Sequence, residues 1–188
     1  MNREEWLLKC TDELRPDFIR VGAELPVKLR ASCGWPSKSG LAPKKPRIGE
    51  AWSATCSGDE TFEIFISPVL QDTTVVLATL VHELTHTSVG IEAKHGSAFK
   101  KVAKAMGLEG KMTSTSAGDR LVERLKEVLA KIGPYPHAEL KFSNAPKKQT
   151  TRLRPVECPA CGYLARITAK WLEVGLPTCP CGEQMVSE

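Results

Sequence analysis

A His-Glu-x-x-His motif constrains this chain more than any other part of its sequence. The motif is His82-Glu83-Leu84-Thr85-His86. On a helix, side chains four positions apart lie on the same face, so the two imidazoles can reach a single Zn²⁺ ion. The apolar residues of this segment fall on the opposite side of such a helix: Val76, Leu77, Leu80, Val81 and Leu84. The motif therefore predicts a helix that is buried along one side and carries a metal site along the other.

A catalytic zinc site needs a third protein ligand and one open position for water. His95 is the favoured third ligand, because Gly90 ends the predicted helix and residues 91–94 can turn the chain back towards the site. His137 and Glu92 are the alternatives, since both have ligand chemistry.

The residues of the motif also predict a reaction. Three neutral imidazoles leave zinc strongly electrophilic, and the pKa of its bound water is then lowered towards ~7. Glu83 neighbours both ligands, so it is predicted to take the proton of this water and pass it to a leaving amine. Tyr135 and His137 are candidates, by residue type alone, for stabilising the oxyanion.

The chain has seven cysteines, and four of them form two close pairs near the C-terminus: Cys158 and Cys161, then Cys179 and Cys181. Four thiolates are typical of a closed, structural zinc site. The second pair is C-x-C, which departs from the usual C-x-x-C spacing. A module with so few apolar residues is expected to take its stability from the metal. The other cysteines match no metal spacing and are interpreted as ordinary thiols: Cys10, Cys33 and Cys56.

Hydrophobic periodicity predicts a mixture of helices and strands. An N-terminal helix begins at the cap residue Asn2 and is broken or kinked at Pro16. Strands are predicted at 27–32, around Trp52, at 62–66 and at 163–168. Further helices are predicted at 73–89, 97–106 and 119–132.

These elements group into two predicted domains. The chain has 188 residues, which is enough for one domain of ordinary size and one small module. Residues 1–140 are expected to form the domain that carries the His-Glu-x-x-His motif. Residues 141–155 are rich in Lys, Arg and Pro and are interpreted as a basic linker. Residues 156–188 are expected to form the zinc ribbon.

Charge is strongly segregated along the chain, although the net charge is only +4. The stretch 51–92 contains no Lys or Arg, and basic stretches at 28–50 and 93–111 flank it. Lys100, Lys101 and Lys104 are close together on the predicted helix at 97–106. Alternating blocks of this kind can form a basic surface that attracts nucleic acid, so nucleic acid is a candidate partner.

The sequence argues against a membrane protein. The longest apolar stretch is far shorter than the ~20 residues of a membrane span, and the N-terminus lacks the apolar core of a signal peptide. A cytoplasmic location is expected, which is the host cytoplasm if a phage encodes the chain. Thiols stay reduced there, so metal binding explains the paired cysteines better than disulfides do.

The order of these motifs resembles the SprT-like family of zinc metallopeptidases, most closely its bacterial and phage-type members. The motif at 82–86, the stretch His95-Gly96-x-x-Phe99-Lys100 and the C-terminal Cys₄ ribbon carry this resemblance, which covers roughly residues 1–188. It implies an α+β fold, with a minimal zincin-type metallopeptidase domain of a small sheet and helices, followed by the ribbon.

The resemblance also implies residue roles. His82, His86 and His95 would be the zinc ligands, and Glu83 the catalytic base. A peptide substrate would lie along an edge strand, for which 62–66 is the candidate. The family includes the Spartan-type proteases, which cleave proteins covalently trapped on DNA.

The leading hypothesis is therefore a zinc-dependent endopeptidase, a hydrolase with one catalytic and one structural Zn²⁺, acting on polypeptides associated with nucleic acid. The alternative is a non-catalytic protein that binds nucleic acid or a transcription complex and uses the zincin domain as a scaffold. A third possibility is a zinc amidase with a small substrate, for which a deep closed pocket would be expected.

Overall fold

The computed structural model describes residues 1–42, 45–141 and 153–187, and its fold is α+β with five α-helices and three small sheets in these ranges. It divides into two compact units, Met1–Asn144 and Ala145–Glu188. The helices of unit 1 are α1 (Arg3–Arg20), α2 (Thr73–Val89), α3 (Ser97–Met106) and α4 (Asp119–Ile132). Its strands are β1 (Leu29–Cys33), β2 (Gly49–Trp52), β3 (Phe62–Ile66), β4 (Leu108–Lys111) and β5 (Ser114–Ala117), and its two 3₁₀ turns are η1 (Ala54–Cys56) and η2 (Ile91–Ala93).

The helices predicted at 73–89, 97–106 and 119–132 are confirmed as α2, α3 and α4. The predicted break at Pro16 is wrong, because α1 continues through this residue to Arg20. Pro16 is exposed, so water can satisfy the carbonyl group that loses its helical donor. Asp17 and Phe18 are buried beyond it, and Asp17 accepts a hydrogen bond of 2.9 Å from Nε of Arg124 on α4. These contacts hold the last turn of α1 in place.

The main sheet has the strand order β1-β3-β2. β3 pairs in parallel with β1 and antiparallel with β2, so both of its edges are occupied. The expectation that a peptide lies along 62–66 is therefore wrong, since this strand is the centre of the sheet. The free edges belong to β1 and β2. The order follows from the parallel β1–β3 pairing, which nothing in the local sequence specifies.

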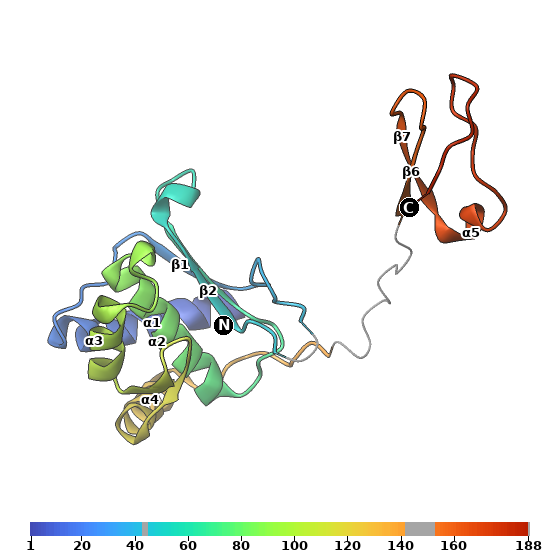
Figure 1. The fold of residues 1–188 in the computed structure, drawn as a ribbon. Coiled ribbons are helices and arrows are strands. Elements are labelled where there is room, and N and C mark those ends of the chain that lie inside the picture. The colour runs from blue at the N-terminus through green and yellow to red at the C-terminus, as the bar shows by residue number, and fades with distance from the viewer. Residues whose placement is uncertain (43–44, 142–152, 188) are drawn as a thin grey trace. The chain divides into compact units, whose positions relative to one another are not determined.

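Helix α2 is the centre of unit 1. It contacts β2 and β3 of the sheet, and also α1, α3 and β5 (Figure 1). The apolar stripe predicted on this helix is confirmed, because all five of its members are fully buried: Val76, Leu77, Leu80, Val81 and Leu84. The side of α2 that carries the histidines is thereby turned towards η2, α3 and β5.

The hairpin of β4 and β5 connects α3 to α4 and was not predicted from the sequence. Its strands have four residues each and include Gly110 and three Ser or Thr side chains. Such strands carry almost no apolar alternation, which is the signal by which a strand is recognised. β5 nevertheless contacts α2, so the hairpin adjoins the helix of the motif.

Unit 2 contains β6 (Leu153–Glu157), β7 (Leu164–Thr168) and α5 (Ala169–Leu172). β6 and β7 form an antiparallel pair over a small core of Val156, Cys158, Cys179 and Met185. Most of the predicted linker at 141–155 lies outside the described residues, while β6 begins at Leu153, inside that range. In the described parts of both units, no helix combines the length and apolar character that crossing a membrane requires.

Candidate metal centres

Three histidines of unit 1 converge on one point. Nε2 of His95 lies 3.2 Å from Nε2 of His82 and 3.2 Å from Nε2 of His86. A tetrahedral zinc ion with Zn–N bonds of about 2.0–2.1 Å would hold its nitrogen ligands about 3.3 Å apart. The donor set and its spacing therefore fit a zinc ion with three histidine ligands and a fourth, open position.

A tight turn brings His95 to the two histidines of α2. The turn begins at Gly90, which has a φ of 88°, a conformation that favours glycine. η2 follows, and Lys94 then adopts a φ of 47° before the chain enters α3. His95 thus stands directly before α3, as the sequence spacing suggested.

The two alternative ligands lie outside the histidine cluster. Nε2 of His137 is 2.9 Å from the carbonyl oxygen of Pro68, and its Nδ1 is 3.4 Å from Nη1 of Arg3. Glu92 is an exposed residue of η2. In the described part of unit 1, the side chains whose ligand atoms lie close enough together to share one metal ion are those of His82, His86 and His95.

Phe99 of α3 packs against all three imidazoles. Its ring centroid is 4.9 Å from that of His82, 4.3 Å from that of His86 and 5.0 Å from that of His95. Phe99 is fully buried. The ring therefore limits the orientations of the histidines and excludes water from one side of the centre.

The environment keeps the histidines neutral, which is the form that binds metal. Burial, with a smaller contribution from His95, lowers the pKa of His82 to about 4. Burial and the neighbouring histidines lower the pKa of His86 to about 3. Burial and the positive charge of Arg47 also lower the pKa of His95.

Glu83 is buried beside this centre, with a side chain that has lost most of its contact with water. Burial raises its pKa to about 8, and the charge of Glu50 adds to this effect. The positive charge of Arg47 and the backbone N–H of Ala51 act in the opposite direction. A carboxyl group with a pKa near neutrality is suited to exchange protons with water and with an amine.

Strand β2 lies directly against Glu83. A Cβ atom at Gly49 would be 2.5 Å from Oε1 of Glu83 and 2.7 Å from Cγ2 of Thr79. Only glycine leaves room for this approach. Gly49 was not singled out from the sequence, because a single glycine at the start of a strand carries no specific signal.

Arg47 is held at the start of β2 by Glu50. Nη1 of Arg47 lies 2.5 Å from Oε1 of Glu50. The same carboxylate accepts hydrogen bonds from the backbone N–H of Ser37 at 2.7 Å and from Nε1 of Trp52 at 3.0 Å. Because the pKa values of Glu83, His86 and His95 all respond to its charge, Arg47 supplies positive potential to the centre. The sequence identified it only as part of a basic stretch.

The two residues considered as oxyanion stabilisers lie elsewhere. The Tyr135 hydroxyl is buried, has no hydrogen bond of good geometry within the described part of the chain, and neighbours the thiol of Cys33. Burial and this thiol raise its pKa. His137 contacts Pro68 and Arg3, as described above. Neither side chain has a contact with the histidine cluster among the interactions of the described residues.

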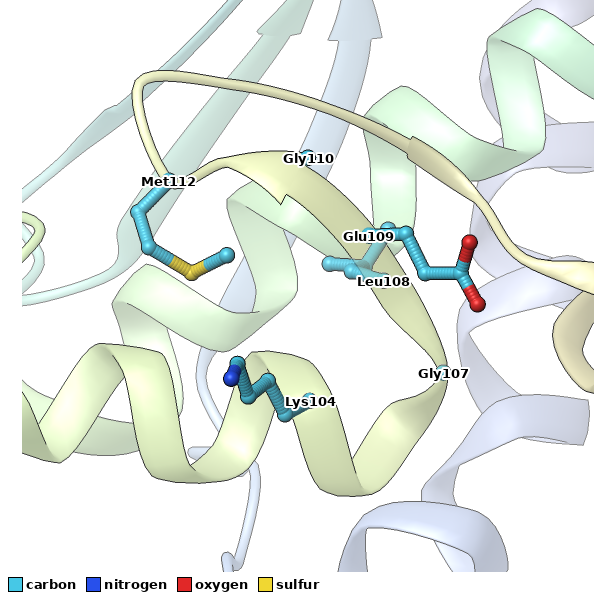
Figure 2. Close-up of a pocket in the computed structure, with 6 residues that line it drawn as sticks. All are labelled: Lys104, Gly107, Leu108, Glu109, Gly110 and Met112. Atoms are coloured by element: carbon cyan, nitrogen blue, oxygen red, sulfur yellow. The ribbon is translucent and has the colours of Figure 1, made fainter.

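A cavity of about 430 Å³ lies between the end of α3 and the β4–β5 hairpin (Figure 2). It is lined by Lys104, Gly107, Leu108, Glu109, Gly110 and Met112. None of these residues belongs to the histidine cluster or neighbours Glu83 in sequence. The cavity is therefore not the enclosed substrate pocket that a small-molecule amidase would need at its metal centre.

The basic residues predicted to contact nucleic acid lie on α3. Lys100, Lys101 and Lys104 are all exposed. No salt bridge of the described residues involves them, whereas Lys126 on α4 pairs with Glu123 at 2.7 Å. The three lysines therefore present uncompensated positive charge on the helix that follows His95.

A second candidate centre lies in unit 2. Sγ of Cys158 is 3.5 Å from Sγ of Cys181, and Sγ of Cys161 is 3.5 Å from Sγ of Cys179. A tetrahedral zinc site with Zn–S bonds of about 2.3 Å has sulfur atoms about 3.8 Å apart, so the four thiols fit such a site. The short C-x-C pair thus still allows all four sulfur atoms to converge.

The loops of this second centre turn at glycines. Gly162 and Gly182 follow the two cysteine pairs with φ values of 73° and 94°. Their backbone N–H groups donate hydrogen bonds to the carbonyl oxygens of Cys158 and Cys179. The remaining cysteines are free thiols, of which Cys10 is buried, Cys33 half-buried and Cys56 exposed.

Comparison of the chain with known proteins gives no significant match to any family model, to any curated protein or to any solved structure. Its function is therefore inferred from the chemistry of the two centres.

Proposed function

We propose that this chain is a zinc-dependent endopeptidase of the SprT-like kind, which hydrolyses peptide bonds in proteins associated with nucleic acid. One observation carries the proposal: Nε2 of His95 lies 3.2 Å from Nε2 of both His82 and His86, and the next residue after His82 is the buried acid Glu83. A metal site that served only to stabilise the fold would have no use for a buried acid of raised pKa next to its ligands.

When bound, zinc supplies a Lewis acid that lowers the pKa of water and polarises a carbonyl group. His82, His86 and His95 in their neutral form would hold the ion. Glu83 takes up a proton at its carboxylate and returns it to the nitrogen of the departing amine, for which a pKa near 8 is suited. Phe99 excludes water from one side of the centre.

The free edge of β2 supports a polypeptide substrate. Within the described strands, β2 pairs only with β3, so its other edge is open to an extended peptide. Gly49 of β2 lies directly against Glu83, since a Cβ atom there would be 2.5 Å from Oε1, so this strand adjoins the proposed base. A peptide added to β2 would pass beside the base. This assignment replaces the expectation that the peptide binds at 62–66.

The test is cleavage of a DNA-bound protein by the zinc-loaded full chain, with and without single-stranded DNA. Glu83→Gln is expected to abolish cleavage, because the amide cannot take up a proton. Glu92→Gln is the matched control, since Glu92 is an exposed acid nearby on η2, and it is expected to cleave as the parent does. Equal cleavage by the Glu83→Gln variant and the parent would refute the assignment of Glu83 as the base, and an inactive parent would refute the peptidase assignment.

A second candidate function is non-catalytic binding of nucleic acid or a transcription complex, with unit 1 as a scaffold. The three exposed and unpaired lysines of α3, Lys100, Lys101 and Lys104, favour it. Binding of a fluorescent single-stranded oligonucleotide would then weaken steeply with salt.

Changing one of these lysines to Gln is expected to reduce the magnitude of the slope of log affinity against log salt by about one, if that lysine contacts a phosphate. Lys126→Gln is the control, since Lys126 is already paired with Glu123. A flat salt response would count against both nucleic-acid binding and the substrate class proposed above.

A further inference from the structure

The β4–β5 hairpin reaches the histidine centre through one hydroxyl group. Oγ1 of Thr115 on β5 lies 2.8 Å from Nδ1 of His82. Burial alternates along β5, with Thr115 and Ala117 half-buried and Ser114 and Ser116 exposed. The pleat of the strand therefore directs Thr115 towards α2 and its two neighbours in the strand towards solvent.

The geometry of His82 determines which of its nitrogens carries the proton. Nε2 of His82 faces the other two ligand nitrogens and needs a free lone pair to bind a metal. In the neutral ring the proton then resides on Nδ1, and Nδ1–H donates to Oγ1 of Thr115. The contact thus selects the tautomer in which Nε2 is available.

His82 differs in this respect from the other two ligands. Nδ1 of His86 is buried and has no hydrogen-bond partner among the described residues. Among the described residues, His95 has polar contacts only through its own Nε2 atom, and none through Nδ1. Thr115 is therefore the polar group that orients a ligand ring from outside the cluster, whereas His86 and His95 are oriented by burial and by Phe99.

We propose that Thr115 is a positioning residue of the metal centre, and that it makes zinc affinity depend on the β4–β5 hairpin. The proposal rests on the metal-binding part of the proposed function and holds whether or not the centre is catalytic. Removal of a hydrogen bond to the distal nitrogen of a histidine ligand typically weakens metal binding about 10–100-fold.

The test is zinc affinity of the full chain, measured by competition with a chromogenic chelator. His82→Ala identifies which phase of the titration belongs to the histidine centre, since the cysteine site remains intact in this variant. Thr115→Val keeps the shape of the side chain and removes the hydroxyl, and it is expected to weaken that phase about tenfold or more. Thr115→Ser restores the hydroxyl and should recover most of the affinity. Ser116→Ala is the matched control on the exposed side of β5.

Equal zinc affinity of Thr115→Val and the parent would overturn the proposal. A Thr115→Ser variant as weak as Thr115→Val would also overturn it, because the methyl group would then be the important part. A further measurement uses the parent protein, so no substitution can disturb the fold. In NMR spectra of the zinc-loaded protein, the Nδ1 proton of His82 should exchange with water more slowly than the Nδ1 proton of His95. Equal exchange would count against the bond to Thr115. All these readouts are independent of peptidase activity, so an inactive parent refutes the proposed function without affecting them.

Discussion

Gly49 and Glu83 lie so close together that no side chain fits between them, since a Cβ atom at Gly49 would be 2.5 Å from Oε1 of the carboxylate. Strand β2 is thereby in direct contact with the acid of the His-Glu-x-x-His motif. The same closeness contributes to the burial that raises the pKa of Glu83. The position of one strand thus determines both the environment of the base and the surface open to a peptide.

Gly49→Ala is expected to abolish peptidase activity and to destabilise unit 1 by about 1–3 kcal/mol, because the added methyl group displaces either β2 or Glu83. Zinc content at the histidine centre should be unchanged, since the atoms nearest to the added methyl group belong to Glu83 and Thr79 and not to a histidine ligand. Gly58→Ala is the control, because a Cβ atom there meets nothing within 4 Å. Thermal unfolding, zinc analysis and cleavage assays would check this, and full activity of Gly49→Ala would contradict it.

Glu83→Gln is expected to stabilise the metal-free chain in a pH-dependent manner. The pKa of Glu83 is raised from 4.5 to about 8 on folding, so the native state retains a proton that the unfolded state releases. The free energy of unfolding therefore falls as pH rises between these two values. Glutamine has no such proton, so the variant avoids this loss.

The gain in stability of Glu83→Gln should be absent below pH 4.5 and should reach a few kcal/mol, to order of magnitude, above about pH 8. Urea unfolding at several pH values, in the presence of a chelator, measures it. Glu92→Gln should show no such trend, because Glu92 is exposed. A gain that does not vary with pH would indicate that burial does not raise the pKa of Glu83.

Arg47→Gln is expected to move the acid limb of the pH–rate profile of cleavage to higher pH. The charge of Arg47 lowers the pKa of Glu83, so its loss raises that pKa, and the base becomes ionised only at higher pH. Lys45→Gln, an exposed change in the same loop, is the control. A profile shifted equally by both changes would point to a general effect of net charge.

Metal analysis of the purified chain is expected to give two zinc ions per molecule. His82→Ala and Cys158→Ser should each reduce the content to one, because each removes a ligand from a different centre. Cys158→Ser should also unfold unit 2, whose small apolar core is insufficient without metal, and leave unit 1 folded. Two-dimensional NMR spectra would show whether the signals of unit 2 collapse while those of unit 1 stay dispersed. Loss of both ions in either variant would show that the centres are coupled.

Local sequence patterns were sufficient for the elements that carry strong periodicity. The apolar stripe of α2 and the stop at Gly90 predicted the central helix correctly, and α3 also has the predicted bounds. Of the two alternatives at Pro16, the break is wrong, because the burial of Asp17 and Phe18 outweighs the single hydrogen bond that proline removes. The β4–β5 hairpin escaped prediction because its two short strands carry almost no apolar alternation.

The sequence by itself determined the chemistry of this protein: two histidines one helical turn apart, an acid between them, and four cysteines in two pairs. Those features are local, since a helix or a tight turn sets their geometry. The tertiary structure decided what surrounds them. The parallel pairing of β3 with β1, the contact of Gly49 with Glu83 and the bond from Thr115 to His82 join residues more than 30 positions apart. Such contacts depend on how whole elements pack, and no local pattern encodes that packing.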